Sequence, residues 1–468
     1  MNYTGPIVYM ERKKKILKNL SGSRILALGF AVAILVGTVL LYLPVATAKG
    51  ETTSLVDALF TATTSICVTG LVTVPTFSHW SLFGQAVILC LIQLGGLGVV
   101  TCSMIAFLIV GKKLTIKNRR LIQESYNLDN LSGMVNLVRR VVFGTLTVET
   151  IGAVLYMFQF VPEYGPRGIW IAVFNSVSAF CNAGIDIIGP ESLRPYVGNP
   201  LVNFTTIFLI IVAGIGFIVW WDVKKILSDV LHRRICLRKC WEKLQFHTKI
   251  VLFTTALLIF GGALFIFIFE WGNPDTIGNM GMGEKIMACL FQSVTTRTAG
   301  FETIAQNRFT DSSGIISMLM MFVGGSPMGT AGGVKTTTMA VLALTTIAYF
   351  RGKKNTDVFH RQISEDNRRT ATVVVMTMVG CLFILIIFLS AATGFSYLDV
   401  SYEITSAIAT VGLTRGITAE LPFVGKLIVI FTMYIGRIGP ITMATAVARR
   451  SKEANTSIER PEKRIIIG

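Results

Sequence analysis

Residues 64–71 read TSICVTGL, a short polar stretch that ends in glycine and leucine within an otherwise apolar part of the chain. A single copy would indicate an ordinary turn. Four stretches share its ending, a glycine followed by a bulky apolar residue: ICVTGL (66–71), FCNAGI (180–185), TRTAGF (296–301) and IATVGL (408–413). Their glycines recur at almost even intervals, which predicts a chain built from four copies of one unit.

The composition indicates a polytopic membrane protein. Of the 468 residues, 52% are hydrophobic and only 15% are charged, which lies outside the range of soluble domains. A spanning helix needs ~20 apolar residues. Eight segments meet this need, three of them interrupted by one charged residue: 25–46, 81–111, 141–161, 200–221, 250–269, 312–350, 370–398 and 427–448.

The net charge of +17 reports membrane topology and does not indicate nucleic-acid binding. Most of the Lys and Arg residues lie in five segments: 1–24, 112–140, 222–249, 351–369 and 449–468. The positive-inside rule places these segments in the cytoplasm. Two spanning segments separate each basic segment from the next, so we expect both termini inside and the four glycine-ended stretches on the outer side.

Each unit is predicted to contain a helix, a re-entrant half-helix, a glycine loop and a second helix. The half-helices are too short to span a membrane and are expected at 57–65, 171–179, 286–295 and 403–407. Clusters of small residues recur in the second helices, where they allow close packing or bending, at 95–98, 213–216, 324–327 and 436–439. The four repeats occupy residues 25–111, 141–221, 250–350 and 370–448. We therefore expect an all-α membrane protein with eight transmembrane helices and four half-helices around a pseudo-fourfold pore.

The glycine loops are candidates for an ion-binding site on the pore axis. Non-helical backbone at membrane depth is tolerated only where protein buries it or where it lines a water-filled path. Its carbonyls can replace the water shell of an ion, and a ring of carbonyls without carboxylates suits a monovalent cation. The expected ligands are the backbone carbonyls of Val68, Thr69, Gly70, Asn182, Ala183, Gly184, Thr298, Ala299, Gly300, Thr410, Val411 and Gly412.

Three charged residues lie beside these loops. Asp186 and Glu302 follow their glycines by two positions, and they either raise the local cation concentration or bond the loop backbone from behind. Arg297 would repel a cation if it faced the axis. We expect it to point away and to bond the loop or the half-helix, with Glu302 or Glu284 as its partner.

Residues 312–350 are too long for one straight spanning helix, and their Gly- and Pro-containing centre cannot remain helical. A broken helix inside the bundle, beneath the glycine loops, is expected to act as a gate. Arg437 replaces a small residue of the other repeats, so it forms either a cationic constriction opposite 324–334 or a buried pair with Glu149 or the loop carbonyls. Lys335 either joins the gate or extends to the inner interface. The expected gate residues are Gly324, Gly325, Ser326, Gly329, Gly332, Gly333, Lys335 and Arg437.

The cysteines predict no disulfide framework, because most of the eight fall inside apolar segments. His232, Cys236, Cys240 and His247 share one basic segment. Either a zinc site or a helical face of small and aromatic residues fits them, although their spacing matches no standard zinc signature.

Beyond the four glycine loops, three longer stretches carry a family resemblance: TTRTAGF (295–301), GGSPMGTAGGVKTTT (324–338) and YIGRIGP (434–440). They resemble the Trk/Ktr/HKT superfamily of potassium transporters, in its Ktr branch, over residues 25–468. The resemblance implies an intramembrane loop that blocks the pore. It also implies a homodimer docked on a separate nucleotide-binding regulatory ring resembling KtrA, controlled by ATP and ADP. Cys67 and Cys181-Asn182-Ala183 depart from the Thr-Val-Gly of strict potassium channels.

The predicted function is monovalent cation transport, potassium uptake in a Ktr-type system, driven by the membrane potential and gated by the intramembrane loop. In plant relatives, serine at the first filter glycine is associated with sodium transport, so Gly70 favours potassium. A sodium or mixed transporter of the same architecture stays the alternative. K⁺ is the expected transported ion, Na⁺ a candidate activator, and no bound cofactor is expected. A membrane enzyme is disfavoured because the four histidines lie in loops and the intramembrane acids are isolated. The expected location is the bacterial plasma membrane.

Overall fold

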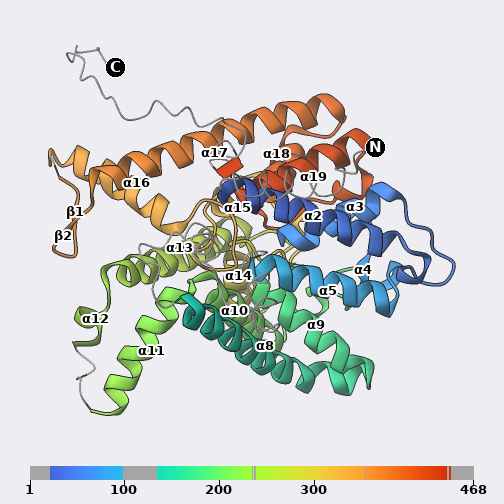
Figure 1. Ribbon diagram of the computed structural model, residues 1–468, viewed down its shortest axis with the longest axis horizontal. Helices are drawn as coiled ribbons and strands as arrows, with labels where there is room; N and C mark the ends of the chain where they lie inside the picture. Colours follow the sequence, from blue (N-terminus) through green and yellow to red (C-terminus); the bar gives the residue numbers. More distant parts are fainter. Residues whose placement is uncertain are drawn as a thin grey trace, which may run out of the picture.

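The computed structural model describes residues 22–98, 134–233, 236, 239–353, 355–439 and 442–443 of the chain. Within these residues nearly all regular structure is helical (Figure 1). The exception is one short antiparallel hairpin, β1 (Asp357–Val358) and β2 (Arg361–Gln362). The N-terminal segment, most of the first predicted linker and the basic tail lie outside the described residues.

Four described helices are long and apolar enough to cross a membrane. They are α2 (Gly22–Tyr42), α8 (Met134–Tyr164), α13 (Phe246–Glu270) and α17 (Glu365–Ala392). Each is the first helix of one predicted repeat. Large apolar side chains are exposed along them, such as Val39, Phe158, Phe260 and Ile387. An apolar outer surface is expected of a helix bundle in lipid, whereas a surface in water carries mainly polar residues.

The second helix of every repeat is interrupted or short. Helix α10 (Pro200–Gly214) turns by 103° into α11 (Phe217–Leu231), so the apolar segment predicted at 200–221 is bent and is not one straight helix. The bend occurs at Gly216, whose φ of 89° suits glycine because it has no Cβ. Helix α15 (Asp311–Phe322) is separated from α16 (Thr336–Phe350) by residues 323–335.

The second helices of the first and fourth repeats end at the same kind of residue. Helices α5 (Leu82–Leu97) and α19 (Phe423–Ile438) stop at Gly98 and Gly439, with φ of 83° and 88°. The remainder of the two predicted segments lies largely outside the described residues. Several shorter elements complete the fold: α4 (Thr76–His79), α12 (Cys240–Lys243), η1 (Pro44–Ala46), η2 (Arg194–Tyr196), η4 (Gln306–Arg308) and η5 (Thr418–Glu420).

Four short helices lie at the centre of the bundle and correspond to the half-helices: α3 (Leu55–Cys67), α9 (Arg167–Cys181), α14 (Met282–Thr295) and α18 (Tyr397–Ala409). They begin earlier than the sequence predicted. The hydroxyls of Ser54 and Ser396 accept hydrogen bonds from the backbone N–H groups of Asp57 and Asp399, which caps α3 and α18. Helices of this length cannot cross a membrane, so the chain that follows each one must return to the side on which the helix began.

The repeats form a closed ring. Each half-helix packs against the second helix of the preceding repeat: α9 against α5, α14 against α10, and α18 against α15. Helix α3 of the first repeat packs against α19 of the fourth, so blue and red ribbons lie side by side in Figure 1. This cyclic packing brings the C-terminal ends of the four half-helices to the middle of the molecule.

Candidate functional site

The four glycine loops meet at the centre of this ring. Gly70, Gly184, Gly300 and Gly412 all have left-handed backbone, with φ of 100°, 64°, 80° and 97°. Each glycine faces the backbone carbonyl of the residue before the next glycine, in the cyclic order Ala183, Ala299, Val411 and Thr69. A Cβ on any of the four would approach that oxygen more closely than 3.0 Å. The structure therefore brings the four predicted loops together as one continuous circle of backbone.

A second left-handed residue precedes each of these glycines by two positions. Val68, Asn182, Thr298 and Thr410 have φ between 53° and 68°. Residues with a Cβ seldom adopt this region, and the strain persists only where surrounding structure enforces it. Its recurrence at the same place in all four loops shows that the loops share one backbone path.

The half-helices hold the loops through hydroxyl side chains. The Gly70 N–H donates to Thr64 Oγ1 and the Gly412 N–H donates to Ser406 Oγ, both at 3.0 Å. In the third repeat, Thr295 Oγ1 instead donates to the Phe301 carbonyl at 2.7 Å. The sequence alone assigned no role to the Ser and Thr residues of these helices. The signal was present, because Thr64 and Ser406 stand six residues before their glycines.

Replacing Ser406 with alanine is expected to destabilise the protein, because the buried Gly412 N–H loses its acceptor. Such an unsatisfied group costs about 1–3 kcal/mol. The apparent melting temperature in detergent should therefore fall by a few degrees. Ser390→Ala, at an exposed position of α17, is the matched control. An unchanged melting temperature for Ser406→Ala would contradict the anchoring role.

The ring residues are shielded from solvent. Thr69, Ala183, Ala299, Val411 and Thr410 all have an exposed fraction of 0%. Backbone carbonyls face the glycines of the neighbouring loops, and the Asn182 side-chain amide donates to Thr298 Oγ1 at 3.4 Å across two loops. No group of three or more His, Cys, Asp or Glu side chains with metal-site geometry occurs among the described residues. The ring can therefore replace water around a cation only through neutral oxygen atoms.

The four candidate zinc residues do not form a metal site among the described residues. His232, Cys236, Cys240 and His247 form no such cluster in the described part of the chain. His232 Nδ1 lies 2.7 Å from the Ser228 carbonyl, and the Cys240 thiol donates to the Cys236 carbonyl. The four residues do not share one helix either, because α11 ends at Leu231, α12 spans Cys240–Lys243 and α13 begins at Phe246, so the alternative of a single helical face is wrong.

The two acids beside the loops bond protein groups. Glu302 pairs with Arg194 at 2.8 Å and accepts a hydrogen bond from the Gln306 N–H at 2.8 Å. Asp186 accepts one from the Ile188 N–H at 3.3 Å. Burial raises the pKa of Asp186 to about 6 and also raises the pKa of Glu302. These contacts correspond to the structural role, one of the two considered for these acids.

The expected pairing of Arg297 with Glu302 or Glu284 is wrong. Arg297 Nη2 lies 3.5 Å from Thr255 Oγ1 on α13, so its side chain is directed toward the first helix of its own repeat. Both carboxylates are engaged elsewhere, Glu302 with Arg194 and Glu284 with the Gly281 N–H at the start of α14. A position three residues before a glycine could not reveal these competing partners.

The broken helix of the third repeat enters the bundle beside the ring. Residues 323–335 are fixed by a parallel bridge between Val323 and Val334. The Ser326 N–H donates to the Gly214 carbonyl at 2.8 Å, and Thr330 Oγ1 donates to the Phe180 carbonyl at 3.1 Å. The segment therefore packs against the bend of the second repeat and the end of its half-helix.

Two cations bond this segment. Arg437 Nη1 donates to the Thr330 carbonyl at 2.7 Å, and Nη2 donates to the Gly95 carbonyl of α5 at 2.5 Å. Arg437 thus joins the first, third and fourth repeats. Lys335 Nζ donates to the Ala331 carbonyl at 2.7 Å, so it folds back onto the segment and does not extend toward the interface.

The sequence offered Arg437 a loop carbonyl or Glu149 as a buried partner. Arg437 bonds the Thr330 carbonyl of the loop and does not pair with Glu149. The Gln93 side-chain amide donates to Glu149 Oε2 at 3.3 Å, and the Cys181 thiol approaches Oε1 at 3.9 Å. Glu149 therefore belongs to a separate polar cluster between the first and second repeats.

Comparison with known proteins identifies the family. The family model of TrkH, a cation transport protein, matches residues 17–457. Ktr system potassium uptake protein B of Bacillus subtilis is 38% identical over 98% of this chain and 99% of its own length. Potassium/sodium uptake protein NtpJ of Enterococcus hirae is 36% identical over 97% and 99%.

A solved structure has the same fold. The potassium transporter TrkH from Vibrio parahaemolyticus superposes with a TM-score of 0.69 at 16% identity, covering 90% of this chain and 84% of that one. The predicted class, a helical membrane protein built from pore-loop repeats, is confirmed. These relatives are transporters and not enzymes. The chain is a member of the TrkH family of cation transport proteins.

Proposed function

We propose that the chain is the potassium-uptake subunit of a Ktr-type system and conducts K⁺ through the ring of four glycine loops. The observation that carries this proposal is the cyclic contact of each glycine with the carbonyl of the next loop. The names of the relatives in Bacillus subtilis and Enterococcus hirae support potassium as the cargo.

The ring would act as a selectivity filter. The carbonyls of residues 68–70, 182–184, 298–300 and 410–412 replace the water shell of K⁺. The half-helices point their C-terminal ends at the ring and add partial negative charge, which favours a cation. Inward flow is driven by the membrane potential, which contributes about 2.3 kcal/mol per charge per 100 mV. This mechanism requires neither a bound cofactor nor a catalytic residue, and Na⁺ enters it only as an activator.

The segment 324–335 would be the gate, with Arg437 as its latch. Its glycines are closely packed, since a Cβ on Gly332 would collide with the Thr410 hydroxyl and one on Gly324 with the Gly332 carbonyl. In this arrangement Arg437 places its own positive charge beneath the ring, and its two hydrogen bonds connect the segment to α5. Opening requires the segment to move and Arg437 to release its two carbonyls.

The proposed assembly is a homodimer in the bacterial plasma membrane, with both termini and the basic linkers in the cytoplasm. The linkers at 112–140, 222–249 and 351–369 separate the four repeats and carry the charge expected of the inner side. A separate nucleotide-binding ring resembling KtrA would dock there. The word "system" in the names of the Ktr relatives supports a subunit of this kind.

Replacing Gly70 with serine is expected to admit sodium. A Cβ there would approach the Ala183 carbonyl and the Cα atoms of Gly184 and Gly412, so the ring must widen or tilt and its match to K⁺ is lost. The experiment measures K⁺ and Na⁺ uptake in a potassium-uptake-deficient bacterium that also produces the regulatory subunit. Gly394→Ser, at a position with open space, should behave as the native chain. Absence of native K⁺ uptake, or identical ion ratios for Gly70→Ser, would sink the proposal.

The second candidate is a mixed K⁺/Na⁺ transporter of the same architecture. It is favoured by the Enterococcus hirae relative NtpJ, which is a potassium/sodium uptake protein. The same uptake measurement separates the two, because a mixed transporter takes up Na⁺ at a comparable rate before any substitution is made.

A further inference from the structure

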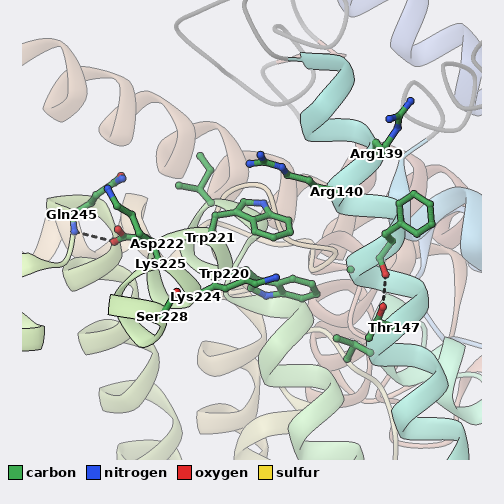
Figure 2. A pocket seen from close by; sticks show the side chains of 14 residues that line it. Arg139, Arg140, Thr147, Trp220, Trp221, Asp222, Lys224, Lys225, Ser228 and Gln245 are labelled. Carbon is green, nitrogen blue, oxygen red and sulfur yellow. Dashed lines mark hydrogen bonds between the residues drawn. The ribbon is translucent and has the colours of Figure 1, made fainter. Parts of the chain in front are cut away.

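A large pocket opens between α8 and α11 (Figure 2), and no residue of the ring or of the gate segment lines it. Its volume is about 1070 Å³. Its lining combines cationic and aromatic side chains, and the name "basic–aromatic pocket" refers to Arg139, Arg140, Trp220, Trp221, Lys224 and Lys225. The cations come from two segments that the charge distribution assigns to the cytoplasmic side.

The basic–aromatic pocket is positively charged. None of the ion pairs found among the described residues involves Arg139, Arg140, Lys224 or Lys225. Arg140 Cζ lies 5.8 Å and Lys224 Nζ 5.7 Å from the centre of the Trp221 ring, and Figure 2 shows Arg140 reaching from α8 toward that ring.

A single acid, Asp222, lines the same pocket, and it does not neutralise the cations. Its Oδ2 accepts a hydrogen bond from the Gln245 N–H at 2.9 Å, at the N-terminus of α13, where a negative charge is favourable. Four cations against one engaged carboxylate leave the lining complementary to an anion.

Exposed apolar side chains lie in the pocket and beside it on α11. Phe143 of α8 is 66% exposed. Helix α11 turns by 103° from α10, so it runs almost at right angles to that helix. Val223, Leu227 and Leu231 follow one another at helical spacing on α11 and are 37%, 64% and 80% exposed. A helix in the plane of a membrane interface buries such a stripe among acyl chains and holds its lysines at headgroup level.

We propose that the basic–aromatic pocket binds the phosphate headgroup of an anionic glycerophospholipid, with the acyl chains along the exposed face of α8. Guanidinium and ammonium groups donate charge-assisted hydrogen bonds to the phosphodiester, and the tryptophans lie at the depth that indoles prefer in membranes. An acidic loop of a cytoplasmic protein would match the charge equally. It would leave the apolar part of the lining, Phe143, Val148 and Ile218, without an apolar partner, so the lipid is the better occupant.

The test measures lipid retention and requires no transport, so its outcome is independent of the proposed function. The full chain, purified in detergent, is mixed with equal amounts of phosphatidylglycerol and phosphatidylcholine, and the retained lipids are counted by native mass spectrometry. The pocket variant carries four substitutions: Arg139→Gln, Arg140→Gln, Lys224→Gln and Lys225→Gln. A control variant loses the same charge at exposed positions outside the pocket: Arg351→Gln, Lys353→Gln, Arg361→Gln and Lys243→Gln.

The native chain and the control variant should retain phosphatidylglycerol, and the pocket variant should retain at least about tenfold less. A fourth protein that exchanges each Arg of the pocket for Lys, and each Lys for Arg, should bind as the native chain does. Gel-filtration elution confirms that all four proteins are folded.

Four results would overturn the proposal. The first is equal retention by the pocket variant, and the second is an equal loss in the control variant. The third is displacement of the lipid by a large excess of inorganic phosphate, which would make the pocket a site for the free anion. The fourth is a pocket variant that retains its lipid but no longer binds a cytoplasmic protein that the native chain binds, which would make the pocket a protein-docking face.

Discussion

Replacing Gly300 with alanine is expected to lower K⁺ uptake by about 100-fold, because the ring has no space for a side chain at this position. Gly300 has a φ of 80°. Its Cβ would collide with the Val411 carbonyl and would stand 3.2 Å from the Cα atoms of Gly184 and Gly412. All three neighbours are backbone, so none can rotate away. The substitution must distort two adjacent loops and displace the oxygen atoms that would contact the ion.

The comparison for Gly300→Ala is Gly380→Ala, which adds the same methyl group to α17 where nothing lies within 4 Å. Uptake of K⁺ into cells should be normal for Gly380→Ala and nearly absent for Gly300→Ala at equal amounts of membrane-inserted protein. Uptake by Gly300→Ala at the native rate would mean that ions do not pass through this ring.

Replacing Arg437 with glutamine is expected to raise K⁺ flux by roughly tenfold in the absence of an activating nucleotide, since charge-assisted hydrogen bonds contribute about 1.5–3 kcal/mol each. Arg437 donates to the Thr330 and Gly95 carbonyls, which ties the gate segment to the first repeat. Its removal also takes a positive charge from the proposed ion path, and both effects favour the open state. The measurement is ⁸⁶Rb⁺ uptake into proteoliposomes.

One further variant, Arg437→Lys, separates the effect of the two hydrogen bonds from that of the charge, and Arg361→Gln is the control. Arg437→Lys keeps the charge, but a single ammonium group cannot reproduce the planar fork that reaches both carbonyls. A flux close to that of Arg437→Gln would therefore assign the effect to the latch, and a flux close to the native value would assign it to the charge. Arg361→Gln, on the exposed strand β2, should leave the flux unchanged. A lower flux for folded Arg437→Gln would contradict the gating role.

The ring could be predicted from the sequence because its signal, a glycine loop, is local and occurs four times. A glycine that must adopt positive φ recurs at 70, 184, 300 and 412, and no other residue type tolerates that backbone as readily. The break around 323–335 is equally visible, since clustered glycines and a proline cannot continue a helix. Arg437 is conspicuous because a charge within an apolar segment requires a partner.

Other features were missed for different reasons, and only the first of them depends on contacts between distant residues. Arg297 lies near two acids in sequence, yet Arg194 occupies Glu302 and the start of α14 occupies Glu284. The bend of 103° between α10 and α11 falls in an unbroken apolar run, which hydropathy interprets as one span. Ser54 and Ser396 set the starts of α3 and α18 through caps that lie upstream of the apolar pattern.

The most direct test of the central claim locates the ion. Crystals of the full chain grown with Rb⁺ or Tl⁺ in place of K⁺ should show an anomalous peak on the axis, among the carbonyls of Thr69, Ala183, Ala299 and Val411. A peak at that position would establish the ring of four glycine loops as the ion site. An empty ring, with the ion bound elsewhere in the protein, would contradict it.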